Sequence, residues 1–125
     1  MFYWKTRYSN AKKMDVNGVR YDSKFEGGIA QELEIRKKTK DIKDFEAHKK
    51  IELCVNGYFI CNYYIDFLVY HNDETLEYIE AKGFPTEVWK IKWKIFESLY
   101  GDKPDVKITL IQQGNFKFRG ARKLK

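Results

Sequence analysis

An Asn-Gly dipeptide at positions 56–57 constrains the fold of this chain more than any other local feature. It separates segments 43–55 and 58–70, which alternate apolar with polar residues or are rich in β-branched and aromatic ones. Asn-Gly readily adopts the left-handed conformations of a two-residue turn, so the two segments predict a long antiparallel hairpin. Cys54 and Cys61 are then diagonal neighbours on its strands, which disfavours a disulfide between them.

Turn and cap signals predict the other elements. Asn17-Gly18 indicates a small hairpin, Ser23 is a good helix N-cap, and Val88 and Ile91 belong to the apolar stripe expected in a second helix. Besides the long hairpin, the main expected elements are a helix over 23–40, a strand over 76–82, a helix that begins at 85 or 86, and a strand over 106–112. The order helix, three strands, helix, strand predicts an α/β fold with a central mixed sheet flanked by helices.

The length and charge of the chain narrow its class. Its 125 residues are 43% hydrophobic, which suits a single domain over 1–125, and no apolar run is long enough to span a membrane. The start of the chain lacks the layout of a secretion signal, which predicts a cytoplasmic protein. The net charge is +6, and segments 1–13 and 114–125 carry basic residues without any acid. Such basic ends either grip a polyanion such as DNA or merely keep the protein soluble.

Two acidic residues are predicted to face each other on the next hairpin. If Tyr70 pairs with Leu76 across the polar loop, Asp66 stands directly opposite Glu80 on one face of the sheet. Adjacent carboxylates repel each other unless a cation lies between them. A shift of one residue would move Glu80 to the other face, so the predicted site depends on this register.

The neighbours of Glu80 suit a hydrolytic metal site. Lys82 lies on the same side of the strand, and the backbone carbonyl of Ala81 is expected to be free near the two acids. Oxygen ligands of this kind suit Mg²⁺, which keeps several waters, and a lysine beside them can orient an attacking water. Alternatively, Glu80 and Lys82 form a solvent-exposed pair of little consequence, but Asp66 within an apolar run is harder to explain in that way.

Glu26 is open to two interpretations. With Ser23 it matches a capping box, in which its carboxylate bonds back to the Ser23 N–H, and the residues alone favour this role. It also lies beside the apolar stripe of its helix, from which it could face Asp66 and Glu80. Gly27-Gly28 in the same turns predicts that another group approaches the helix backbone closely.

Three stretches in this order resemble the PD-(D/E)xK nuclease superfamily and, within it, a family of small phage and prophage nucleases. They are 17–26, 64–67 and 80–84, the last followed by Lys92-Trp93-Lys94. Ile65 stands where the superfamily often has a proline before its aspartate. The resemblance implies a restriction-endonuclease-like core, with element order αβββαβ, and an enzyme that hydrolyses phosphodiester bonds.

The resemblance also implies roles for individual residues. Asp66, Glu80 and the carbonyl of Ala81 would hold Mg²⁺, with Mn²⁺ as a substitute. Lys82 would position the water, and Glu26 would complete the catalytic site, which reverses the choice made from the residues alone. Members of the superfamily include restriction enzymes, repair nucleases and junction resolvases, so the fold alone does not determine the substrate.

Contacts to nucleic acid are expected from cations outside the catalytic site. Lys90 and Lys94 share a face of the second helix and suit phosphate contact, although lysines beside a tryptophan-lined core often only cover it. The expected contacts are Lys12, Lys13, Lys90, Lys94, Lys117, Arg119 and Arg122.

The function predicted from the sequence is that of a Mg²⁺-dependent DNA endonuclease. The small size leaves no separate domain for reading sequence, which favours recognition of DNA shape, such as a branch or junction, by a homodimer. A phage origin would place the protein in the cytoplasm of a bacterial host. The alternative is a nucleic-acid-binding module on a nuclease scaffold that is catalytically inactive.

Overall fold

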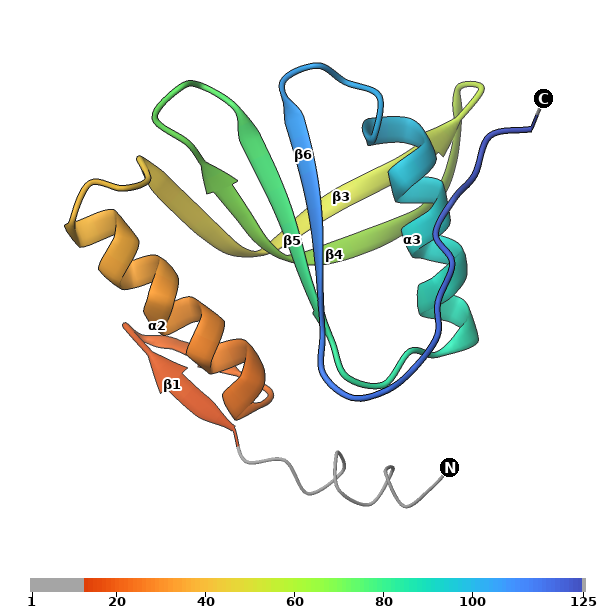
Figure 1. The fold of residues 1–125 in the computed structure, drawn as a ribbon. Helices are drawn as coiled ribbons and strands as arrows, with labels where there is room; N and C mark the ends of the chain where they lie inside the picture. The colour runs from red at the N-terminus through yellow and green to blue at the C-terminus, as the bar shows by residue number, and fades with distance from the viewer. Residues whose placement is uncertain (1–12, 125) are drawn as a thin grey trace.

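A computed structural model describes residues 13–124 of the chain. A four-stranded sheet with the order β3-β4-β5-β6 forms its centre, and a small sheet, β1-β2, lies beside α2 (Figure 1). The elements are β1 (Met14–Val16), β2 (Val19–Tyr21), α2 (Lys24–Lys38), β3 (Asp44–Val55), β4 (Tyr58–Tyr70), β5 (Leu76–Lys82), α3 (Glu87–Tyr100) and β6 (Val106–Gln112). Because β6 is parallel to β5 while the other neighbours are antiparallel, the sheet is mixed. The predicted α/β fold is confirmed.

Local turn signals explain why the strands begin and end where they do. The hairpins turn at Asn17-Gly18 and Asn56-Gly57, and all four of these residues have the positive φ that such turns require. Tyr70 pairs with Leu76, the register on which the predicted site depends. Both cysteines are free, as predicted. Within residues 13–124, no helix is long and apolar enough to cross a membrane.

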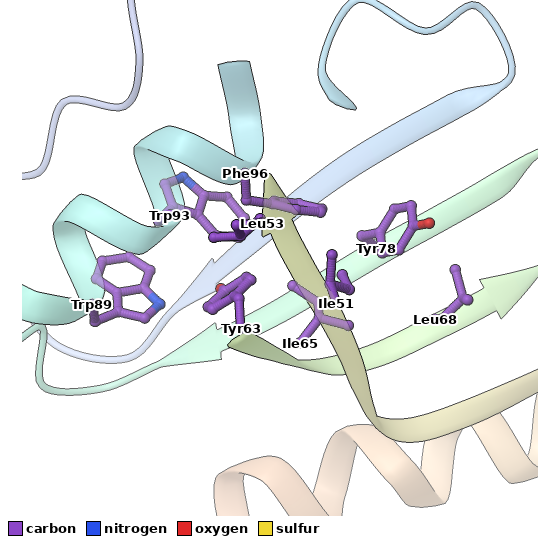
Figure 2. Packing of buried hydrophobic residues seen from close by; sticks show 9 residues of the cluster. All are labelled: Ile51, Leu53, Tyr63, Ile65, Leu68, Tyr78, Trp89, Trp93 and Phe96. Atoms are coloured by element: carbon purple, nitrogen blue, oxygen red, sulfur yellow. The ribbon is translucent and has the colours of Figure 1, made fainter. Parts of the chain in front are cut away.

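Aromatic side chains dominate the core beneath α3. Trp89, Trp93 and Phe96 point from this helix onto the sheet (Figure 2). The predicted apolar stripe is wrong in its first turns, because Val88 and Ile91 are 63% and 61% exposed. The aromatic side chains carry more apolar area than the aliphatic ones, and the helix is rotated to bury them.

A second core joins α2 to the sheet. Its buried residues are Tyr21, Ala30, Leu33, Ile42, Phe67, Val69 and Ile79. Gly27 is buried because Met14 lies against it: a Cβ added to Gly27 would come within 2.9 Å of the Met14 Cβ. The predicted close approach is therefore confirmed at Gly27, whereas Gly28 has no neighbour within 4 Å of such a Cβ.

Strands β3 and β4 bend together in the middle (Figure 1). Odd-numbered residues of β4 belong to the α3 core before the bend, as Ile65 does, and to the α2 core after it, as Phe67 does. His48 of β3 has a φ of 55°. The register would place His48 opposite Asp66, but this pair is missing from the ladder. The bend thus frees Asp66 from regular pairing at the point where the α2 and α3 cores meet.

Candidate active site

The ladder between β4 and β5 opens where the two predicted acids lie. Regular pairing ends at Phe67 and Ile79, one position before Asp66 and Glu80. Beyond this point the N–H of Ala81 donates to Oδ2 of Asp66 at 2.7 Å. The N–H and C=O of a strand residue point to the same side, so the Ala81 carbonyl faces the same opening.

Glu80 is buried, with only 3% of the residue exposed, and only half of its carboxylate is paired. Oε2 accepts a hydrogen bond from Trp89 Nε1 at 3.0 Å and lies 3.4 Å from Lys82 Nζ. Oε1 is buried and has no hydrogen-bond partner in the described part of the chain, and the same holds for the hydroxyl of nearby Tyr63. Burial raises the pKa of Glu80, while Lys82, the Tyr63 hydroxyl and Trp89 act to lower it. The Tyr63 hydroxyl is therefore near the carboxylate, although its placement completes no hydrogen bond to Oε1. An unpaired buried carboxylate oxygen is costly unless a cation or a proton joins it.

Burial and two other carboxylates raise the pKa of Asp66. Burial, followed by the charges of Glu80 and Glu26, raises the pKa of Asp66 to about 8, against the opposing effects of the Ala81 N–H and Lys82. Acids from α2, β4 and β5 therefore act on one another at the opening. A divalent cation placed there would favour the ionised form of Asp66, because it supplies the opposite charge that the site lacks.

Glu26 faces the sheet from the first turn of α2. The Ser23 hydroxyl accepts a hydrogen bond from the Glu26 N–H at 3.2 Å, which is half of the predicted capping box. The Glu26 carboxylate lies 3.0 Å from Nε2 of His48 and its charge reaches Asp66. The side chain is therefore turned toward β3, within electrostatic reach of Asp66.

His48 and Trp89 are site neighbours that the sequence analysis missed. His48 fits no ligand motif, and only its register position opposite Asp66 could have indicated it. Trp89 was expected only as a core residue, but a buried indole N–H normally needs an acceptor, which here is Glu80. The Trp89 ring also lies beneath Lys82, with Nζ 4.9 Å from the ring centroid.

Asp66, Glu80 and Ala81 carry the oxygen atoms that could hold a metal ion at the opening. Over residues 13–124, no group of three or more His, Cys, Asp or Glu side chains is placed to hold a metal ion. Asp66 and Glu80 offer two carboxylates, and the Ala81 carbonyl adds a second type of oxygen. Mg²⁺ accepts few protein ligands because it keeps several waters. The unpaired Oε1 of Glu80 is the atom that such a cation would satisfy.

The predicted DNA-binding cations differ in their solvent exposure and in whether an acid already pairs with them. Lys90 forms an ion pair with Glu87 at 3.0 Å, so part of its charge is already compensated. Lys12 lies outside the described residues. The exposed members of the set are Lys13, Lys94, Lys117, Arg119 and Arg122.

A family profile matches residues 5–119 of the chain, which include every residue of the candidate site. The chain belongs to the DUF1064 family. DUF1064 is described as a protein of unknown function, so the family adds no activity to the argument. No curated protein and no solved structure matches the chain. What this DUF1064 protein does must therefore be inferred from the geometry of its site.

Proposed function

We propose that this protein is a Mg²⁺-dependent DNA endonuclease that hydrolyses phosphodiester bonds and prefers branched DNA. The observation that carries the proposal is the buried, unpaired Oε1 of Glu80, whose carboxylate acts on that of Asp66. Raised pKa values and unsatisfied polar atoms gather at sites that act on a ligand more often than at structural ion pairs.

Each residue of the opening has a part in the proposed reaction. Asp66, Glu80 and the Ala81 carbonyl would hold the metal. Mg²⁺, when bound, supplies positive charge to the phosphate and lowers the pKa of a bound water. Lys82 lies beside Glu80, where its ammonium group can orient the attacking water and stabilise negative charge on the phosphate. Glu26, held by His48, adds a third carboxylate to the opening.

The reaction assigned to this site is a hydrolysis with balanced products. The oxygen of water attacks phosphorus as the water gives up a proton, the bond from phosphorus to the 3′ oxygen breaks, and that oxygen takes up a proton. The products are a 5′-phosphate and a 3′-hydroxyl. No covalent enzyme intermediate is needed, because water itself is the nucleophile.

DNA is the proposed substrate because of charge. The net charge is +6, and exposed cations lie on α3 and in the segment after β6. Cations of this kind contact phosphates irrespective of base sequence. Because phosphate contacts do not depend on base identity, they favour DNA shape as the feature recognised. A homodimer would present two such sites to the two strands of a branch.

A second candidate function is DNA binding without cleavage. It is favoured by the lack, among the described residues, of three side chains placed around a common metal position. The two candidates differ in whether the opening binds a divalent cation. Titration of the wild-type protein and of Asp66→Asn with Mn²⁺ in a calorimeter separates them, because a binding module gives no heat that depends on Asp66.

The proposal is tested with a four-way junction, a flap and a linear duplex of shared sequence in Mg²⁺. We expect the wild-type protein to cut the branched DNAs faster than the duplex. In EDTA, Asp66→Ala and Glu80→Ala should bind the junction as the wild type does. In Mg²⁺, both variants should leave it uncut. Undiminished cutting by both variants would exclude the assigned site, and tight binding without any cutting by the wild type would support the second candidate.

A further inference from the structure

The segment after β6 runs along the outside of α3 (Figure 1). We call residues 114–124 the C-terminal strap. Two contacts join the strap to α3: the Phe118 ring packs against Trp89, and the Ala121 N–H donates to Glu97 at 2.8 Å. In addition, Lys123 pairs with Asp102, just after the helix, at 3.0 Å. A Cβ added to Gly120 would collide with the Glu97 carboxylate, which shows how closely the strap lies on the helix.

The strap has an inner and an outer side. Phe116, Phe118 and Gly120 are half-buried, whereas Lys117 and Arg119 between them are exposed. Phe118 packs against the core beneath α3. The strap thus combines an apolar anchor with the outward cations that were assigned to DNA.

Trp89 connects the strap to the candidate site. Its ring centroid lies 5.0 Å from that of Phe118. Its Nε1 donates to Oε2 of Glu80 at 3.0 Å, and the Lys82 ammonium lies 4.9 Å from its ring centroid. The indole therefore contacts the strap and also the two β5 side chains on which the proposed hydrolysis depends.

We infer that Phe118 is a positioning residue, which acts through Trp89 to fix the carboxylate of Glu80; the inference rests on the proposed function for its role in metal binding. With Oε2 held by the indole, the orientation of the carboxylate is set and Oε1 remains available. Phe118 packs against the Trp89 ring, so it limits rotation of the indole and keeps water from competing for its N–H. Groups that orient a ligand from behind typically change metal affinity by about 10–100-fold when they are removed.

The test compares Phe118→Ala and Phe118→Leu with Tyr58→Ala, which removes a 74% exposed aromatic ring from the hairpin tip. The first readout is the hydrogen-exchange rate of the Trp89 indole N–H, measured by NMR in metal-free protein. The second is the affinity for Mn²⁺, measured by calorimetry. We expect Phe118→Ala to speed the exchange about tenfold and to weaken Mn²⁺ binding about three- to tenfold, less than a direct partner of a ligand would. Phe118→Leu should restore most of both, and Tyr58→Ala should match the wild type.

The outcomes separate this inference from the proposed function. Wild-type exchange and wild-type Mn²⁺ affinity in Phe118→Ala would overturn it. Faster exchange with unchanged Mn²⁺ affinity would also overturn it, because Phe118 would then be structural only. If the wild-type protein does not bind Mn²⁺, the proposed function fails, while the exchange of the Trp89 N–H still decides whether the strap orients the indole. If Phe118→Ala does not fold, Phe118→Leu decides. The inference is contradicted if Phe118→Leu, at matched stability, has the same indole exchange rate and the same Mn²⁺ affinity as the wild type.

Discussion

Two glutamates on β5 are both buried, but only one of them is fully paired. Glu77 is 7% exposed, and its partners are His71 Nε2 at 2.7 Å, Thr109 Oγ1 at 2.5 Å and Lys107 Nζ at 3.9 Å. Glu80 is 3% exposed, and its Oε1 has no partner in the part of the chain that the structure describes. The same strand thus carries one carboxylate with its partners in place and another that lacks one.

The pKa values of the two groups diverge accordingly. Burial would raise the pKa of Glu77, but hydrogen bonds from Thr109 and His71 outweigh it, and the pKa is lowered. Burial prevails at Glu80, and its pKa is raised. Burial alone therefore does not mark a functional carboxylate. A missing partner is the feature that points to a ligand, because a ligand can remove the electrostatic cost of the unpaired oxygen.

The largest expected effect distinguishes these two glutamates by activity. Glu80→Gln should slow cutting of junction DNA in Mg²⁺ by about 10³-fold, because a charged metal ligand contributes several kcal/mol to the transition state. Glu77→Gln should stay within about threefold of the wild-type rate while lowering the free energy of unfolding by about 1–2 kcal/mol. Cleavage rates under single-turnover conditions and urea unfolding give the two quantities. Equal rates for the two variants would remove the distinction.

Lys82 allows the comparison to be sharpened, because it contacts the half of Glu80 that is already paired. Lys82→Gln should slow cutting about 10²-fold, the lower end of what a positioned acid–base group contributes. Mn²⁺ should bind at least as tightly as in the wild type, since a competing cation is gone. Rates at saturating metal and calorimetric titration measure the two effects. Loss of metal binding in this variant would instead make Lys82 a structural partner of Glu80.

Much of the fold and the central pair of the site could be predicted from local signals. The register of β4 and β5 follows from the polar loop between Tyr70 and Leu76, and it brings Asp66 and Glu80 to the same position beyond the last regular pair. Turn residues and strand patterning act over a few positions, so a single sequence reveals them. For Glu26 the residues alone left two roles open and favoured the helix cap, and only the resemblance favoured a place near this site.

The remaining features depend on packing between distant segments. The bend at His48 has no sequence signal, because a positive φ at a histidine is set by the structure around it. The exposure of Val88 was mispredicted because an apolar helix residue can face either the core or the solvent. The larger aromatic side chains decided the rotation of α3. The role of Trp89 as a donor to Glu80 appears only when α3 is docked on the sheet.

The pH dependence of stability should have opposite signs for Glu77 and Asp66, because the pKa of one is lowered and that of the other is raised. The pKa of Glu77 is lowered, so its contribution is present at neutral pH and is lost as the pH falls into the acidic range. The pKa of Asp66 is raised to about 8 from 3.8, so ionising it destabilises the fold progressively between these pH values. In metal-free protein, Asp66→Asn should exceed the wild-type free energy of unfolding by about 2 kcal/mol at pH 8, and the gain should vanish near pH 4.

Urea unfolding of both variants at pH 4, 6 and 8 measures this sign. Glu77→Gln should lose stability relative to the wild type most at pH 8 and least at pH 4. Mg²⁺ at pH 8 should stabilise the wild type and leave Asp66→Asn unchanged. A gain for Asp66→Asn that is the same at all three pH values would contradict the assignment, because it would come from packing.

The smallest expected effect concerns the histidines that accompany the acids. His71 lies 2.7 Å from Glu77 and its side chain is 22% exposed, whereas His48 lies 3.0 Å from Glu26 and its side chain is 44% exposed. His71→Asn should lower the free energy of unfolding by about 1 kcal/mol and leave the cleavage rate unchanged. His48→Asn should alter stability by less than about 0.5 kcal/mol, because asparagine tolerates the positive φ and exposed pairs contribute little. It should slow cutting about three- to tenfold, because Glu26 loses the partner that orients it. Equal rates in the two variants would make His48 a second structural histidine and leave Glu26 to act without support from β3.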